Sequence, residues 1–176
     1  MSYSAPQYGV GWAASHTINN LSPYSSCVQI GMVSTAYTHP ANDLAIYCPV
    51  RFHERVVVRR LMATIQVPSG NVDIGIYSAG GIRLVSTGTT AAASDLTVDV
   101  TDTVVGPGLF YLAFTADNTT VSYVGPGLAA PILCAYGVLT QQLGAGAALP
   151  ATATWAVNQT NMYAPGLAAV VSAVIA

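Results

Sequence analysis

Hydrophobic and polar residues alternate with a period of two through the middle of the chain, between residues 55 and 124. In the run RVVVRRLMATIQV (55–67), the apolar side chains of the second half share one parity: Leu61, Ala63, Ile65 and Val67. This period is typical of a strand with one face in the core and one face in water. The pattern therefore predicts a half-buried strand over 55–67.

The alternation resumes after the turn signal PSGN. A strand over 72–77 would bury its valine and isoleucines and place Asp73 on the solvated face. The Gly-Gly pair in the turn SAGG (78–81) predicts a hairpin, since glycine readily adopts the positive φ of tight turns. A return strand is expected over 82–87.

More strands are predicted on both sides of this hairpin. Downstream, alternation runs over 95–100, 110–115 and 119–124, with a GPG turn (106–108) after the first. Apolar runs elsewhere predict strands over 28–37, 44–50, 132–139, 152–157 and 167–175, the fourth within a Gly/Ala/Thr-rich loop at 141–166. Helix caps, helix-forming residues and a 3.6-residue period nowhere coincide. The expected fold is all-β, an antiparallel, jelly-roll-like β-sandwich.

The first 27 residues differ from the rest of the chain. They are rich in Ser, Tyr and Asn and show no periodicity. We therefore predict an extended N-terminal arm over 1–27, joined to a single β-sandwich domain over 28–176 whose best-patterned part is 55–124. A chain of 176 residues is long enough for one such domain with an ordinary core.

Charged side chains make up only 7% of the chain, against roughly 25% in ordinary soluble domains. Residues 1–42 and 118–176 contain no Asp, Glu, Lys or Arg. Interface cores are depleted in charge, so the uncharged ends predict surfaces covered by other subunits; a solvated surface of neutral polar residues is the alternative. The formal net charge of −2 argues against a nucleic-acid partner.

The ends of the chain show no export or membrane signal. Residues 1–6 lack the basic and apolar regions of a signal peptide, and the apolar tail 167–176 is shorter than the roughly 20 residues of a bilayer span. We expect synthesis in a host cytoplasm and no membrane partner. There, Cys27, Cys48 and Cys134 predict buried free thiols, although a disulfide formed after release from the cell stays open.

The residue types that catalysis requires do not fall into a catalytic pattern. No G-x-S-x-G elbow is present, and Glu54 is the single glutamate, whereas glycoside hydrolysis needs two carboxylates across a cleft. We predict a protein that is not an enzyme and uses no cofactor or metal. Asp95, Asp99 and Asp102 leave one alternative, a Ca²⁺ site of carboxylate oxygens, against polar decoration of a strand edge.

Two groups of residues are candidates for binding. The densest charge is the arginine cluster Arg51, Arg55, Arg59 and Arg60, which either pairs with nearby carboxylates or contacts an acidic neighbouring subunit. Trp12 and Trp155 complete the predicted interface. The same two tryptophans are candidates for stacking on a sugar ring, with packing in a core or interface as the alternative.

The runs VDIGIYSAGGIRLVSTGTT (72–90) and DLTVDVTDTVVGPGLFYLAFTADNTT (95–120) carry a pattern of strands and turns. This pattern resembles β-sandwich proteins of tailed bacteriophage particles, such as capsid decoration proteins, head fibres and tail appendages. The resemblance implies a structural protein of the virion that assembles, often as a homotrimer, and contacts other virion proteins. It transfers no catalytic residue.

Two functions follow as hypotheses. The first is a virion structural protein that acts through contacts between subunits. The second is a carbohydrate-binding or adhesin module that recognises glycans on the host surface.

Overall fold

A computed structural model describes residues 15–17, 26–30, 35–52, 55–125, 137–144, 146–156 and 164–174. Every regular element in these ranges is a β-strand. The all-β prediction is therefore confirmed. Over the same ranges, no helix is long and apolar enough to cross a membrane. Trp12 and Cys134 lie outside the described residues.

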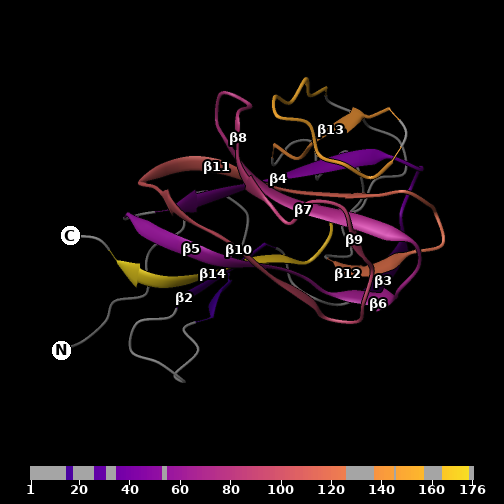
Figure 1. Cartoon of the computed structure of the whole chain (residues 1–176), viewed down its shortest axis with the longest axis horizontal. Helices are drawn as coiled ribbons and strands as arrows, with labels where there is room; N and C mark the ends of the chain where they lie inside the picture. The colour runs from indigo at the N-terminus through magenta and orange to yellow at the C-terminus, as the bar shows by residue number, and fades with distance from the viewer. Residues whose placement is uncertain are drawn as a thin grey trace.

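The first sheet has five antiparallel strands in the order β1-β2-β14-β5-β10 (Figure 1). It joins the two ends of the described chain to its middle. Its strands are β1 (Ser15–Thr17), β2 (Ser26–Ile30), β5 (Val56–Ala63), β10 (Leu96–Val105) and β14 (Leu167–Val174).

The second sheet follows the order β13-β4-β11-β7-β8, with β9 beside β7. Its strands are β4 (Leu44–Phe52), β7 (Asn71–Ser78), β8 (Arg83–Ser86), β9 (Thr90–Ala91), β11 (Gly108–Ala116) and β13 (Leu139–Gln142). A third, three-stranded sheet has the order β3-β12-β6. It is formed by β3 (Thr35–Thr38), β6 (Ile65–Val67) and β12 (Ser122–Gly125).

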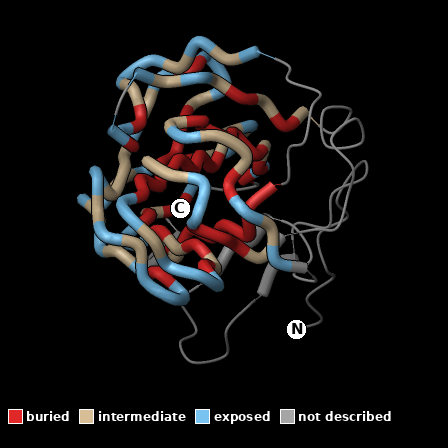
Figure 2. The backbone as a smooth tube through the Cα atoms, turned by 90° about the vertical axis from the view of Figure 1, so that its right-hand side faces the viewer, coloured by how far each residue is buried: buried red, intermediate tan, exposed pale blue. Residues whose placement is uncertain are grey.

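The main core lies between the inner faces of the first two sheets. β5 contributes Val58 and Leu61, and β4 and β11 contribute Ile46, Leu112 and Phe114, all fully buried. Figure 2 shows the buried backbone gathered in the interior and the exposed backbone around it. Antiparallel sheets packed face to face through apolar side chains make this a β-sandwich, as predicted. The jelly-roll connection stays a prediction.

The GPG turn (106–108) links the two layers. β10 before it pairs with β5, whereas β11 after it pairs with β4 and β7. The turn is therefore a corner of the sandwich rather than the end of a hairpin. The SAGG turn is a hairpin, as predicted: it joins β7 to β8, and Gly81 has φ of 84°.

Several predicted strands differ from the observed ones. The strand predicted over 55–67 is two strands, β5 and β6, which belong to different sheets. Val67 is consequently 47% exposed rather than buried. The strand over 28–37 also divides, into β2 and β3. Of the strand over 152–157, only isolated bridges at Thr152 and Ala156 form. Most of the strand over 132–139 lies outside the described residues.

Asp73 overturns a second expectation. The alternation in β7 assigned it to the solvated face, but its side chain is 1% exposed. Six consecutive residues of β7 are buried, on both faces of the strand. Alternation identifies which side chains share a face, but whether that face meets water depends on what packs on it.

The uncharged C-terminal strand is covered by the chain itself. β14 lies between β2 and β5 in the first sheet. Leu167 and Ala169 belong to the main core. Its lack of charge is therefore explained by burial within one molecule and gives no support to a contact between subunits.

The predicted boundary between arm and domain falls inside β2, which contains Cys27. β2 pairs with β1 on one side and β14 on the other. Part of the 1–27 segment thus belongs to the first sheet. The arm itself stays a prediction, because residues 1–14 lie outside the described residues.

Candidate interaction surfaces

The predicted site residues are distributed over the two outer faces of the sandwich. Arg59 and Arg60 project from β5 on the first sheet. Arg51 is on the outer face of β4 in the second sheet, and Trp155 packs on that same face. Arg55 directly precedes β5 and is exposed. The structure therefore divides the arginine cluster: Arg59 and Arg60 share the first sheet, whereas Arg51 lies on the second sheet and Arg55 precedes β5.

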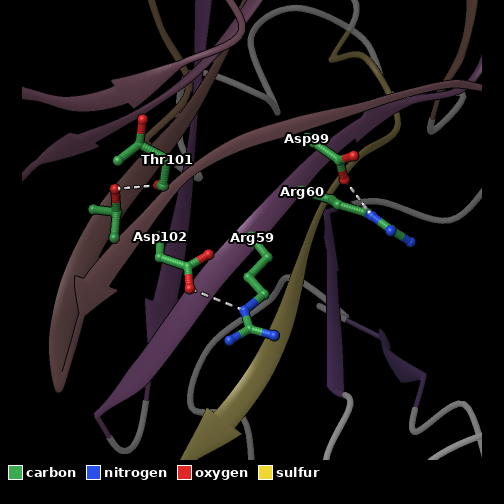
Figure 3. A network of polar contacts seen from close by, with 6 residues as sticks. Arg59, Arg60, Asp99, Thr101 and Asp102 are labelled. Carbon is green, nitrogen blue, oxygen red and sulfur yellow. Dashed lines mark hydrogen bonds and ion pairs between the residues drawn. The ribbon is translucent and has the colours of Figure 1, made fainter.

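On the first sheet, Arg59 and Arg60 are paired locally (Figure 3). Arg59 Nε lies 3.1 Å from Asp102 Oδ2, and Arg60 Nε lies 2.6 Å from Asp99 Oδ1. All four side chains are more than half exposed, so each pair contributes about 0–1 kcal/mol. The pairs border a shallow groove of about 450 Å³, also lined by Val100, Val170 and Val171.

These ion pairs also bear on the calcium alternative. Asp99 and Asp102 each face an arginine, and Asp95 does not join them. No three metal-ligating side chains converge anywhere in the part of the chain that the structure describes. The carboxylates of β10 thus act as partners for β5.

The outer face of the second sheet is covered, in contrast, by the described residues 137–144 and 146–156. This covering segment contains β13 and lies beside β4 and β7 (Figure 1). Leu149 packs at its centre, over Gly75 of β7. A Cβ atom at Gly75 would lie 2.9 Å from Leu149 Cδ1, so the missing side chain makes room for the leucine. A second small core results, formed by Ala45, Tyr47, Tyr77, Ala113 and Leu149.

Two carboxylates hold the covering segment through its backbone. Asp43 Oδ1 accepts hydrogen bonds from the N–H groups of Gly146 and Ala147, at 3.0 and 2.9 Å. Asp73 Oδ2 accepts one from the Leu149 N–H at 2.9 Å. Burial raises the pKa of Asp73, and the Leu149 N–H and the Thr87 hydroxyl that bond to it oppose the rise. Asp73 thus accepts hydrogen bonds that hold the fold together. This explains why an acidic side chain is buried at a position that the sequence pattern assigned to the solvated face.

Two buried tyrosines attach the same segment. Tyr47 donates its hydroxyl to Gln141 Oε1 at 3.0 Å, and the same oxygen accepts the Thr154 N–H at 2.8 Å. Tyr77 donates to the carbonyl oxygen of Pro150 at 2.5 Å. Burial raises the pKa of Tyr47 to about 12 and raises that of Tyr77 as well, so both remain neutral donors.

Trp155 closes the covering segment at one end and is half-buried. Its ring centroid lies 5.5 Å from that of Tyr47, edge-on, and 4.7 Å from that of Tyr111, at a tilt of 47°. Gly81 of the hairpin lies beside the same segment: a Cβ there would be in ordinary contact with Trp155 Cζ2, at 3.6 Å, and closer to the Ala153 carbonyl oxygen, at 3.1 Å. The rings therefore form a pre-organised aromatic platform, of which Trp155 and Tyr111 are partly exposed.

Beyond Tyr111, the described part of the chain leaves the outer face of the second sheet uncovered. Leu109, two residues earlier on the same face of β11, is 43% exposed. Its Cα partner across the ladder is Arg51 of β4, which is exposed. In the part of the chain that the structure describes, Arg51 and Arg55 have no carboxylate within ion-pair distance. The aromatic platform and an arginine that has no carboxylate partner among the described residues thus lie on neighbouring strands of one face.

The thiol of Cys48 does not belong to either surface. It is fully buried in the main core, and burial raises its pKa to about 12. A nucleophilic cysteine requires the opposite shift, so Cys48 is an inert core residue, as predicted.

Sequence reasoning named Trp155 and Arg51 by residue type and missed Tyr111 and Leu109. The signal for these two was their shared parity with Tyr47 and Arg51 across the β4–β11 ladder, which needs the strand pairing to be known. The chain matches no family model, no curated protein and no solved structure.

Proposed function

We propose that this protein is a non-enzymatic structural subunit of a tailed-bacteriophage particle that acts through contacts with copies of itself and with other virion proteins. The pattern of strands and turns over 72–120 resembles such proteins. A homotrimer located in the virion is the form that the resemblance favours. The low charge of the chain, 7%, suits surfaces that meet protein rather than water.

The observation that carries the proposal is a surface at the GPG corner. Val104 and Leu109 flank the turn and are 44% and 43% exposed. Arg55 lies at the same end of the sandwich, since its neighbour Val56 pairs with Val105. Val104 is on the outer face of the first sheet and Leu109 is on that of the second, so the two exposed apolar residues lie on either side of this end of the sandwich. Together with an arginine that has no carboxylate partner among the described residues, they suit a contact surface. We call Arg55, Val104 and Leu109 the corner surface.

A charge placed on the corner surface tests this proposal. Val104→Asp should convert a particle-forming oligomer to a smaller species in sedimentation velocity, because an aspartate buried at an interface costs several kcal/mol. Val67→Asp is the matched control, at a valine that is 47% exposed in the third sheet, at the other end of β5 (Figure 1). An unchanged mass for Val104→Asp would show that the corner surface takes no part in the contacts between subunits.

A second function is supported by the aromatic platform. Trp155 and Tyr111 present two fixed, partly exposed rings, the arrangement on which sugar rings stack. This supports a module that recognises host-surface glycans, which can coexist with a structural role. The companion residue Trp12 lies outside the described residues. Loss of binding to a glycan array in Trp155→Ala, with retained binding in Arg59→Gln, is the expected result; equal binding by both variants would refute it.

A further inference from the structure

We infer that the aromatic platform, together with Arg51, forms a binding site for a carboxylate-bearing sugar. The inference rests on the second proposed function and specifies its ligand. The site consists of Trp155, Tyr111 and Leu109, with the Arg51 guanidinium at its uncovered end.

The strand register places these side chains together. Arg51 and Leu109 are direct Cα partners on neighbouring antiparallel strands. Tyr111 is diagonal to Arg51 on the same face, a separation of about 7–8 Å that a long side chain can span. Trp155 follows at 4.7 Å from Tyr111, ring centroid to ring centroid. Trp155, Tyr111 and Arg51 thus share one face of the second sheet, with Tyr111 in contact with the tryptophan and diagonal to the arginine.

The rings are held before any ligand binds. The Trp155 ring packs edge-on against Tyr47 at 5.5 Å, and the N–H of Ala153, two residues earlier, donates to the Gly81 carbonyl oxygen at 2.8 Å. Main-chain bonds between Thr140 and Ala156 fix the chain on the C-terminal side of the tryptophan, at 2.9 and 2.8 Å. A site whose aromatic groups are already ordered loses little conformational entropy on binding.

The charge at the site selects the ligand. Arg51 is exposed and has no carboxylate partner among the described residues, unlike Arg59 and Arg60 on the other face. A guanidinium binds a carboxylate through two parallel hydrogen bonds. A sugar ring stacked on the platform would place such a group, carried by the same or the next sugar unit, within reach of Arg51.

The size of the surface favours a small ligand over a protein. A fully buried aromatic side chain covers about 150–250 Å², and here both rings are already partly covered by the chain. The exposed remainder of Trp155, Tyr111 and Leu109 falls well below the roughly 800 Å² per partner of a stable protein interface. Two or three sugar units match this extent.

The experiment compares acidic sugars with their neutral counterparts. An array of oligosaccharides containing glucuronic, galacturonic or sialic acid is printed beside the same oligosaccharides after carboxyl reduction, and the strongest pair is titrated by calorimetry. We expect the wild type to bind the acidic member at least about tenfold more tightly, the usual contribution of a charge-assisted pair. Arg51→Gln should abolish that preference, because only the acidic ligand uses the guanidinium.

Arg59→Gln is the matched control, since it removes an exposed arginine from the opposite face. It should retain the full preference. Arg51 is exposed, so its substitution leaves the core intact and a loss of binding is not a loss of fold.

The possible failures are distinguishable. Equal affinity for acidic and reduced ligands in the wild type overturns this inference and leaves glycan binding standing. An Arg51→Gln variant with the wild-type preference overturns it too. Binding to no glycan removes both the inference and the second function. In that case, a smaller sedimentation mass for Trp155→Phe would show that the platform contacts a protein subunit instead.

Discussion

The outer faces of the two sheets differ in what separates them from water. The first sheet presents Arg59, Arg60, Asp99 and Asp102 to water as exposed ion pairs. The second sheet buries its outer face under the covering segment, on a core of tyrosines, alanines and Leu149. Charged side chains thus meet the water on the first sheet, whereas a further segment of the chain covers the second. An uncharged stretch of sequence can therefore indicate internal cover as readily as a partner.

The first prediction concerns the centre of the covered face. Leu149→Ala should lower the free energy of unfolding by about 2–5 kcal/mol, because it leaves a cavity over Gly75 in a packed site. Leu109→Ala, at a leucine that is 43% exposed on the uncovered part of the same face, should cost less than about 1 kcal/mol. Urea unfolding of both variants measures the difference. Equal losses would mean that the segment does not cover the sheet.

The second prediction concerns the pH dependence of stability that a buried histidine causes and that the exposed charged groups do not. His39 is 1% exposed between Phe114 and Tyr123, and neither of its ring nitrogens has a hydrogen-bond partner within the described residues. Burial lowers its pKa from 6.5 to about 4. The unfolded chain therefore takes up a proton at a higher pH than the folded chain does. The contribution of His39 to stability should therefore fall by about 3 kcal/mol as the pH falls from about 6.5 to about 4.

His39→Phe should remove this pH dependence, because the apolar ring cannot be protonated. Asp99→Asn, in an exposed ion pair of the first sheet, should retain it. Urea unfolding at pH 4.5 and pH 7 provides the comparison. If His39→Phe showed the wild-type change between these two values, the buried histidine would not be the cause.

The third prediction concerns the acid that anchors the covering segment. Asp73→Ala removes the acceptor of the buried Leu149 N–H and should cost about 1–3 kcal/mol. Asp73→Asn keeps an amide oxygen there and should cost less. Thermal unfolding of the two variants orders them. An alanine variant as stable as the wild type would mean that the bond to Leu149 contributes nothing.

The smallest effect is expected on the open face. Asp99→Ala removes the partner of Arg60 at a position where both side chains are more than half exposed. The loss should be about 0–1 kcal/mol and should shrink further in high salt. A loss as large as that of Asp73→Ala would erase the contrast between the two faces.

The strands were predictable because their signal is local. Alternation over 96–100 and the apolar runs that became β4 and β14 each identify a strand without reference to the rest of the chain. The inner and outer faces of β7 were also correctly distinguished, with Ile74 and Ile76 in the main core.

The covering segment could not be predicted from the sequence, because contacts between residues far apart in the chain hold it in place. Leu149 and Asp73 are 76 positions apart in the sequence. Nothing near Asp73 shows that a loop will donate a hydrogen bond to it. The division of 55–67 between two sheets has the same origin, since β6 pairs with β12 and β5 pairs with β10 and β14. The candidate site was only half predicted for this reason: Trp155 and Arg51 were named, but Tyr111, whose ring packs against Trp155, was not.

The most direct test of the proposed structural role is the mass of the wild-type protein in solution, measured by mass photometry from micromolar down to nanomolar concentration. We expect a stable oligomer throughout that range, with a trimer at three times the 18.1 kDa mass of one chain. A single chain of 18.1 kDa at every concentration would contradict it.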